Sequence, residues 1–219
     1  MTEETTKSDT RRARGRGRPK GAVSSTSRDA LLNAAIDAFG DRGFEGASLK
    51  QISDVAGADV ALTRYYFGSK DGLWRAAIDH LAAQLTKDLQ QTFTTEHSSN
   101  AEALKAAIRW FVDMSSRWPQ ISRIIVFEGN ADEDRRNYVT GRLVQPFYVL
   151  MEMMIRGAKA EGAIGDISTR TLFFMITHGG SFPMALPELT NAFPGGDIGR
   201  PQNLKTHAEA IIAMVFGTD

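Results

Sequence analysis

The sequence predicts an all-α protein in which a small helix-turn-helix unit near the N-terminus precedes a larger helical domain. Apolar residues recur at intervals of three and four along most of the chain, which is the spacing of one helix face. Residues 48–70 hold two short segments of this kind around a glycine-containing turn, as two linked helices require. A continuous apolar run at 121–128 is short enough for a strand, but no neighbouring segment could pair with it, so we predict a helix there.

The composition limits the kinds of protein that the chain could be. It has 219 residues, of which 42% are hydrophobic and 24% are charged, as is ordinary for a globular protein. It contains no cysteine, which excludes disulfides and thiolate metal sites. No apolar run approaches the roughly 18 to 20 uncharged residues that span a bilayer, and no secretory pattern opens the chain. We therefore expect a cytoplasmic protein without a membrane partner.

Charge is divided unevenly along the chain. The formal net charge is zero, yet residues 1–28 carry eight basic and three acidic side chains, so the remainder of the chain is acidic. A cationic end on an acidic body indicates that nucleic acid binds at the cationic end.

Residues 1–25 are predicted to form a disordered basic arm, because apolar residues are scarce and glycine and proline interrupt any helix. The run RRARGRGRPKG resembles an AT-hook, a short element that lays arginines along a narrow minor groove. Arg16 and Arg18 are the residues that we expect to be inserted there. The alternative is a solvated tail that only improves solubility.

The two short helices that follow carry recognisable start and stop signals. Ser48 and Gln51 have the spacing of a reciprocal capping box. Gly57 can take the left-handed conformation that ends a helix, and Asp59 has the short acceptor side chain of the next N-cap. These signals predict a helix up to Gly57 and another over residues 60–67.

The helix at 60–67 has two different faces. Leu62 and Tyr66 lie four residues apart on the inner side, which can pack. The outer side consists of Val60, Ala61, Arg64 and Tyr65. Small residues allow close approach to the major groove of DNA, and Arg and Tyr can reach base edges or phosphates. An ordinary amphipathic helix pair would show the same spacing, so the two interpretations stay open on spacing alone.

A resemblance favours the DNA-binding interpretation. The run GADVALTRYYFGSKDGL at 57–73 is similar to the signature of the TetR family of bacterial transcriptional regulators, and ALLNAAIDAFGDRGFEG at 30–46 is similar to that family's first helix and turn. The resemblance implies the following DNA contacts: Ser48, Gln51, Val60, Ala61, Leu62, Arg64, Tyr65, Tyr66 and the phosphate-binding Lys70. Two residues depart from the family pattern. Val60 leaves the base preference open, and Thr63 replaces a usual aliphatic residue and suggests a slightly looser inner face.

Six further helices are predicted after this unit, at 70–92, 103–117, 121–128, 134–160, 168–185 and 203–216, with a possible bend at Pro146. We expect polar or Pro- and Gly-rich loops at 94–101 and 186–202. The resulting domains are the arm at 1–25, the DNA-binding domain at 26–70, and a ligand-binding and dimerisation domain at 71–219. The helix at 70–92 would link the two domains mechanically.

The larger domain carries aromatic residues and methionines that could surround a hydrophobic or aromatic effector. The candidates are Trp110, Phe111, Met114, Trp118, Phe127, Phe147, Met151, Met154, Phe174 and His178. The alternative for each of them is an ordinary place in the core.

The resemblance also implies a four-helix dimer interface built from the last two helices of each subunit. The apolar stripes of those helices are Leu172, Ile176, Gly179, Pro183, Leu204, Ala208, Ile211, Ile212 and Val215. The alternative is that these stripes close the chain's own core.

The sequence gives no support for an enzyme, a metal site or a cofactor. The four histidines lack metal-ligand spacing, and Ser181 in HGGSFP lacks the Gly-x-Ser-x-Gly turn of a hydrolase nucleophile. We predict a homodimeric repressor that binds a palindromic operator and is released by a small hydrophobic effector. The alternatives are a ligand-independent architectural DNA-binding protein and a small-molecule-binding helical protein without a regulatory role.

Overall fold

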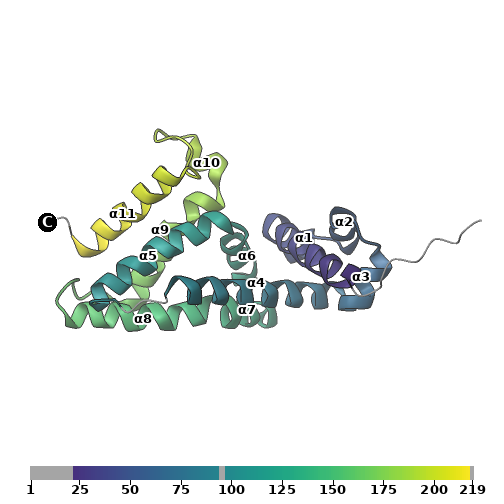
Figure 1. Ribbon diagram of the computed structural model, residues 1–219, viewed down its shortest axis with the longest axis horizontal. Helices are drawn as coiled ribbons and strands as arrows, with labels where there is room; N and C mark the ends of the chain where they lie inside the picture. The colour runs from purple at the N-terminus through teal and green to yellow at the C-terminus, as the bar shows by residue number, and fades with distance from the viewer. Residues whose placement is uncertain (1–21, 94–96, 218–219) are drawn as a thin grey trace, which may run out of the picture.

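The computed structural model describes residues 22–93 and 97–217, and every regular secondary-structure element in that part of the chain is a helix. Three helices form a unit at one end of the molecule, which we call the head: α1 (Ala22–Gly46), α2 (Leu49–Val55) and α3 (Val60–Phe67) (Figure 1). The other helices form the body. The predicted all-α fold, with a helix-turn-helix unit ahead of a larger helical domain, is confirmed.

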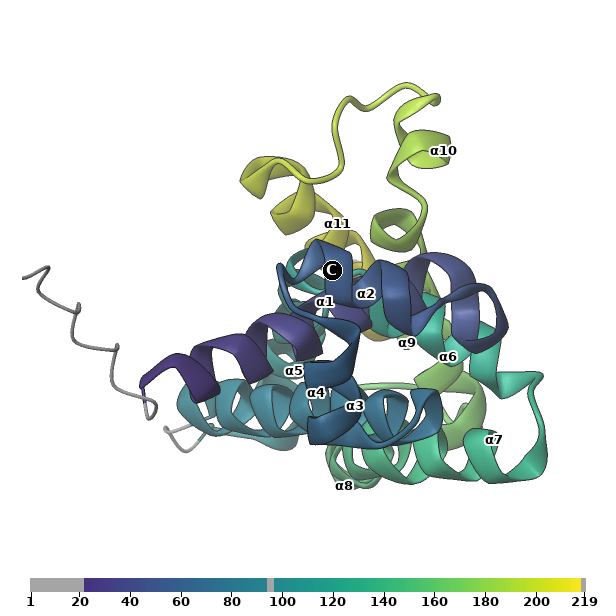
Figure 2. The same ribbon diagram turned by 90° about the vertical axis from the view of Figure 1, so that its right-hand side faces the viewer.

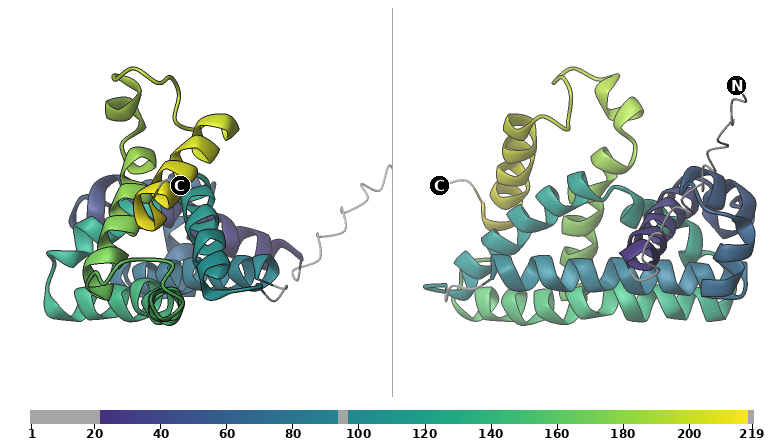
Figure 3. Two further views of the ribbon diagram at one scale, coloured as in Figure 1. Left: turned by 90° about the vertical axis from the view of Figure 1, so that its left-hand side faces the viewer. Right: turned by 45° about the vertical axis from the view of Figure 1, so that its right-hand side comes forward.

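A long helix joins the head to the body. α4 (Lys70–Thr92) begins at Ser69, whose hydroxyl accepts a hydrogen bond from the Gly72 amide at 3.0 Å. It runs along the body beside three continuous helical segments: α7 (Glu133–Val139), the π-helical η1 (Thr140–Val144) and α8 (Gln145–Ala160) (Figures 1 and 3).

The second layer of the body crosses above α4. It contains α5 (Asn100–Arg117), α6 (Gln120–Gly129) and α9 (Thr169–Ala185). α6 turns back toward the head and packs against α1. The chain ends with α10 (Pro187–Asn191) and α11 (Pro201–Phe216), which rise from the body as an arch, with α11 packed on α5 and α9 (Figures 1 and 3).

Two clusters of buried apolar side chains hold the layers together. The first contains Phe39 and Trp74 and joins α1, α2 and α4 to α5, α6, α7 and η1. The second contains Met151 and Ile176 and joins α5, α8, α9 and α11. Because the first cluster crosses the boundary predicted at residue 70, the head shares its core with the body.

Most predicted helices agree with the structure to within two residues at each end, and four details differ. α1 begins at Ala22, within the arm predicted at 1–25. α5 begins three residues earlier than predicted, since Ser99 caps it and the Glu161 carboxylate accepts hydrogen bonds from the Asn100 and Ala101 amides. The predicted helix at 134–160 contains the π-helical turn just before Pro146, which has no amide hydrogen to continue the ordinary pattern. α10 lies within the predicted loop at 186–202.

Every helix among the described residues is too short or too polar to cross a membrane.

Candidate nucleic-acid interface and ligand cavity

The turn between α2 and α3 follows its sequence signals closely. The Ser48 hydroxyl accepts from the Gln51 amide at 3.2 Å, and the Asp59 carboxylate accepts from the Ala61 amide at 2.7 Å. Gly57 has φ 63°, the left-handed conformation expected at the end of α2. The reciprocal half of the capping box is not made, because the Gln51 side chain accepts from Arg42 Nη1 at 2.8 Å instead.

The inner face of α3 is fixed by a polar pair. Thr63 is fully buried, and its hydroxyl lies 2.7 Å from the hydroxyl of Ser53 on α2, which is also fully buried. The Ser53 hydroxyl donates to the Leu49 carbonyl at 2.7 Å. The expectation of a looser inner face at Thr63 is therefore wrong, since the hydroxyl that replaces the aliphatic side chain binds α2 directly.

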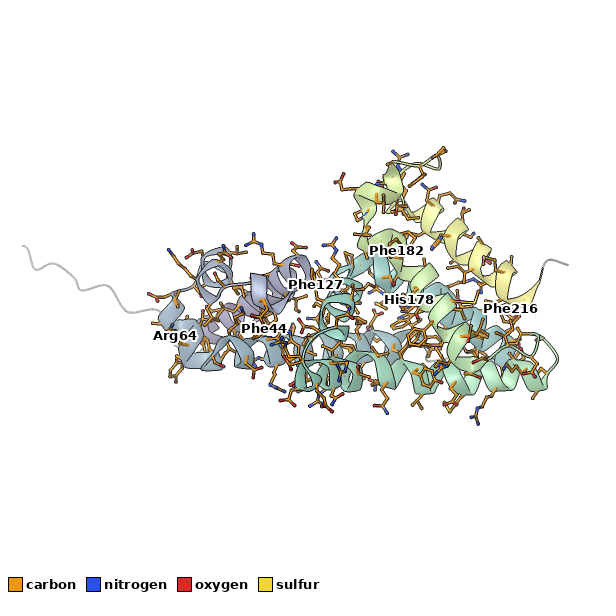
Figure 4. The ribbon with its side chains drawn as sticks, turned by 180° about the vertical axis from the view of Figure 1, so that it is seen from behind. Phe44, Arg64, Phe127, His178, Phe182 and Phe216 are labelled. Carbon is orange, nitrogen blue, oxygen red and sulfur yellow. The ribbon has the colours of Figure 1, made fainter. Side chains whose placement is uncertain are left out.

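The outer face of α3 is open to solvent. Ala61, Arg64 and Tyr65 are exposed, with 83% of Tyr65 accessible, whereas Val60 is half-buried. Figure 2 looks at the head end, where α2 and α3 lie in front of the other helices, and Figure 4 places Arg64 at the extreme tip of the head. A short helix with small residues at its start and Arg and Tyr beyond can enter a major groove without obstruction.

The other predicted DNA contacts differ in how accessible they are. Gln51 is exposed and Ser48 is half-buried. Leu62 and Tyr66 are half-buried on the inner side of α3, and Tyr66 packs against the first core. Arg16 and Arg18 lie outside the described residues.

Lys70 already has partners within the protein. Its ammonium group donates to the Glu45 carbonyl at 3.2 Å and lies 4.6 Å from the centre of the Phe44 ring. An ammonium group has three donors, so a phosphate could be added to this arrangement without breaking it.

The body contains a cavity of about 870 Å³, a size typical of sites for small organic ligands. Seven of the predicted ligand residues line it: Trp110, Phe111, Met114, Phe127, Phe147, Phe174 and His178. Figure 4 shows Phe127 at the junction of head and body and His178 further into the body. The structure therefore brings most of the predicted set to one cavity.

Three predicted ligand residues lie elsewhere. Met151 and Met154 are buried in the second core between α5, α8, α9 and α11. Trp118 follows the end of α5 and stacks beneath the Arg117 guanidinium at 4.6 Å. Helical spacing placed these side chains on apolar faces but could not tell which apolar face borders the cavity.

Part of the cavity wall was missed by sequence analysis. η1 contributes Arg142, Leu143 and Val144, three successive residues that a regular α-helix would point in different directions. Gly40 and Asp41 of α1 also line the cavity, so the wall includes part of the head. Neither contribution follows from a 3.6-residue period.

Comparison with known proteins decides the family. Residues 31–77 match "Bacterial regulatory proteins, tetR family", and residues 101–215 match "Tetracyclin repressor-like, C-terminal domain", which alone covers more than half of the chain. The chain belongs to the TetR family of transcriptional regulators.

Relatives of this TetR-family chain are regulators. RutR of Escherichia coli K12 is 31% identical over 153 residues, which cover 69% of this chain and 71% of RutR. The solved hemolysin II transcriptional regulator HlyIIR has 19% identity and a TM-score of 0.66, covering 89% of this chain and 99% of its own. AibR, solved with isovaleryl coenzyme A and operator DNA, has 17% identity and a TM-score of 0.69, covering 88% and 100%. At these identities the two solved structures show the shared fold alone.

The TetR head and body meet at a buried ion pair. Glu128 of α6 is 2% exposed, accepts from Arg135 Nε at 3.1 Å, and also accepts from the Phe44 amide of the head at 3.3 Å. Burial raises the pKa of the Glu128 carboxyl above its ordinary value of 4.5, and the Arg135 charge opposes that shift. Arg135 also reaches Glu45 of the head at 3.4 Å. The pair therefore joins α6 and α7 to the C-terminal end of α1.

A second set of polar contacts ties α4 to the cavity wall. Asp88 of α4 accepts from Trp110 Nε1 at 2.8 Å and from both terminal nitrogens of Arg117 at 2.9 and 2.8 Å. Hydrogen bonds from Arg117, and to a smaller degree from Trp110, lower the pKa of the Asp88 carboxyl. Trp110 thus lines the cavity with its ring and holds α4 with its N–H group.

Most residues predicted for the TetR dimer interface face inward. Five of them are buried within the chain's own core: Leu172, Ile176, Ala208, Ile211 and Ile212. Pro183, Leu204 and Val215 are half-buried, whereas Gly179 is exposed and its carbonyl accepts from His207 of α11 at 2.9 Å. Four other large apolar residues of these helices are exposed, namely Phe174, Met175, Phe182 and Met214, with 46%, 56%, 53% and 76% of their surface accessible, and Phe174 and Phe182 also line the cavity. For the five buried residues, the alternative of an internal core describes the structure.

Proposed function

We propose that this TetR-family protein is a cytoplasmic, ligand-responsive repressor that binds a palindromic operator as a homodimer and is released by a small hydrophobic effector. The observation that carries the proposal is the outer face of α3, where Arg64 and Tyr65 are exposed on a rigidly capped helix. A helix presented in this way can read base edges in the major groove. The role is regulatory rather than catalytic.

The homodimer is supported by the outward faces of α9 and α11. Met175 and Met214 are large apolar side chains that the protomer leaves exposed and that do not line the cavity. A second copy packed on them would bury that surface and place two α3 helices on opposite sides of a two-fold axis. Such an arrangement requires a palindromic site.

Release by an effector is supported by the position of the cavity. Its wall includes Gly40 and Asp41 of α1 as well as Leu85 and Leu89 of α4, so a bound molecule would contact both the head and the helix that joins the head to the body. The effector must bind the DNA-bound and released states with different affinities, and couplings of this kind are typically about 1 to 3 kcal/mol.

Arg64→Ala tests the DNA-binding surface. Loss of a side chain that contacts bases should weaken operator binding by about 1 to 3 kcal/mol without changing the fold. The DNA for this test consists of operator fragments selected from random sequences, and footprinting measures the affinity. Arg156→Ala is the matched control, because Arg156 is 73% exposed on α8 of the body. Equal affinities of the Arg64 variant and the unaltered protein would refute the groove assignment.

Removal of residues 1–22 tests the arm, whose first 21 residues lie outside the described part of the chain. If its arginines bind phosphates and the minor groove, the truncated protein should bind more weakly and with a flatter salt dependence. The log–log slope should change by about 0.9 for each phosphate that the arm neutralises. An unchanged slope would show that the arm is only a solubilising tail.

A compound screen separates the proposed function from its alternatives. Acyl and aromatic compounds suit the apolar cavity wall, and at least one effector should weaken the footprint. A footprint that responds to no compound that binds the cavity would indicate an architectural DNA-binding protein. Ligand binding without any footprint would indicate a binding protein with no regulatory role.

A further inference from the structure

The cavity wall is largely apolar but contains an arginine at the place where three helices meet. Arg123 of α6 donates from Nη1 to the Asp41 carboxylate of α1 at 2.6 Å and from Nε to the Ala185 carbonyl of α9 at 2.8 Å. All three residues line the cavity. Arg123 therefore joins the head to the end of α9 from within the wall.

A second arginine of the wall is arranged in a similar way. Arg142 of η1 lies 3.1 Å from the Asp79 carboxylate of α4, and Asp79 also accepts from the Tyr138 hydroxyl at 2.8 Å. Arg123 is thus paired with a carboxylate on α1 of the head, and Arg142 with a carboxylate on α4, which joins the head to the body.

These ion pairs are suited to exchange. The Asp41 side chain is 57% exposed, and partly solvated pairs of this kind contribute only about 0 to 1 kcal/mol. A guanidinium has five N–H donors, and the described residues of the protein use the Nε and Nη1 groups of Arg123. A carboxylate or phosphate in the cavity could therefore bind the remaining N–H donors of Arg123. Because the existing pair with Asp41 is weak, the ligand could also replace Asp41 at little cost.

Arg123 is the better candidate of the two arginines for binding an anion. Its side chain is 27% exposed, whereas that of Arg142 is 56% exposed, so solvent weakens its electrostatic interactions less. The wall also includes Glu188, an exposed acidic residue, which would favour a cation if it dominated the site. Titration with ligands of opposite charge decides whether Arg123 or Glu188 sets the charge of the ligand that the cavity binds.

We propose that the cavity takes an anionic amphiphile, whose apolar body lies among the aromatic residues and whose carboxylate or phosphate binds Arg123 in place of Asp41. Because Asp41 belongs to α1, this exchange breaks an ion pair between the head and α6 when the ligand binds. The inference rests on the proposed function for its regulatory meaning, but the choice of ligand charge is independent of DNA.

The test is calorimetric titration of the full chain, without DNA, with decanoate, decylamine and decanol at neutral pH and below their micelle concentrations. The three compounds share one chain length and differ in head-group charge. Decanoate should bind at least about 10-fold more tightly than decanol, as one charge-assisted hydrogen-bonded contact allows. Equal binding of the acid and the alcohol, tighter binding of the amine, or no binding of any of them would overturn the proposal.

Variants test the role of Arg123 in that preference. In Arg123→Gln the ratio of decanoate to decanol affinities should fall to about one, and Arg123→Lys should keep part of the preference because the charge remains. Arg142→Gln should keep most of it. The assignment to Arg123 is wrong if Arg142→Gln abolishes the preference and Arg123→Gln does not. Circular dichroism shows whether each variant is folded.

Asp41→Asn shows whether Asp41 competes with the ligand for Arg123 or holds Arg123 in position to bind it. If Asp41 competes with the ligand for Arg123, removing its charge should tighten decanoate binding by several-fold, on the order of the modest strength of an exposed ion pair. If Asp41 instead holds Arg123 in position, the affinity should fall, and the proposed exchange would be wrong. A footprint that survives while these titrations fail would leave the proposed DNA-binding function intact.

Discussion

Two aromatic clusters of the molecule contain similar residues but differ in packing. The junction cluster, between head and body, consists of Phe39, Phe44, Trp74 and Tyr138. Phe39 and Trp74 are 1% and 0% exposed, and the Lys70 and Arg135 cations lie 4.6 and 4.3 Å from the centre of the Phe44 ring. Phe44 and Tyr138 are half-buried, and none of the four rings borders the cavity of the body.

The cavity cluster consists of Trp110, Phe111, Phe147 and Phe173. Phe147 lies at its centre, stacked on Phe111 with ring centroids 5.3 Å apart, and is half-buried. All four residues border the cavity of about 870 Å³. The comparison shows that aromatic content alone does not define a ligand site, since what differs is whether the helices around the rings leave space.

Truncation of one ring in each cluster should give the largest contrast. Phe39→Ala removes a fully packed ring and should lower the free energy of unfolding by about 3 to 5 kcal/mol. Phe147→Ala removes a ring with space beside it, which packs against fewer atoms, so the decrease should be smaller. Urea unfolding at one fixed protein concentration measures both variants. Equal decreases would mean that the cavity cluster is packed as tightly as the junction.

Arg135→Ala breaks the junction next to its aromatic cluster. It removes the cation over the Phe44 ring and leaves the buried Glu128 carboxylate without its charged partner. The expected loss of stability is about 3 kcal/mol, at the low end for a broken buried pair, because Glu128 can take up a proton. In the double variant with Glu128→Gln the loss should be smaller. A change as small as that of Arg156→Ala on the exposed face of α8 would contradict a role in the junction.

The raised pKa of Glu128 gives a prediction with a definite sign. Folding favours the protonated carboxyl, so its contribution to stability is present below the ordinary pKa of 4.5 and is lost as the pH rises through the higher folded-state pKa. The side chain introduced by Glu128→Gln cannot ionise. As the pH is raised above 4.5, the unaltered protein should therefore lose stability relative to the variant, and the variant's unfolding free energy minus that of the unaltered protein should increase. Unfolding curves measured from pH 4.5 upward follow this difference, and a constant difference would show that burial does not control the carboxyl.

The two regions also differ in how far the sequence predicts them. The caps at Ser48, Asp59 and Ser69 act within three residues along the chain, which is why the bounds of α3 and α4 agree with prediction. The cavity depends on helices far apart in sequence, such as α1 and η1, and on a π-helical turn without a periodic signature. For the same reason, the inward stripe of α9 and α11 could be recognised as apolar but not assigned to a partner or to the core.

The smallest expected effect concerns the polar pair beneath α3. Thr63→Val restores an aliphatic residue of equal shape but removes a hydroxyl that lies 2.7 Å from Ser53, so stability should fall by about 1 kcal/mol. Ser53 keeps its bond to the Leu49 carbonyl, which limits the decrease. Adding Ser53→Ala should cost less than the sum of the single changes, because no polar group then remains unpaired between the helices. Urea unfolding of the four proteins gives the coupling, and additive decreases would mean that the two hydroxyls act independently.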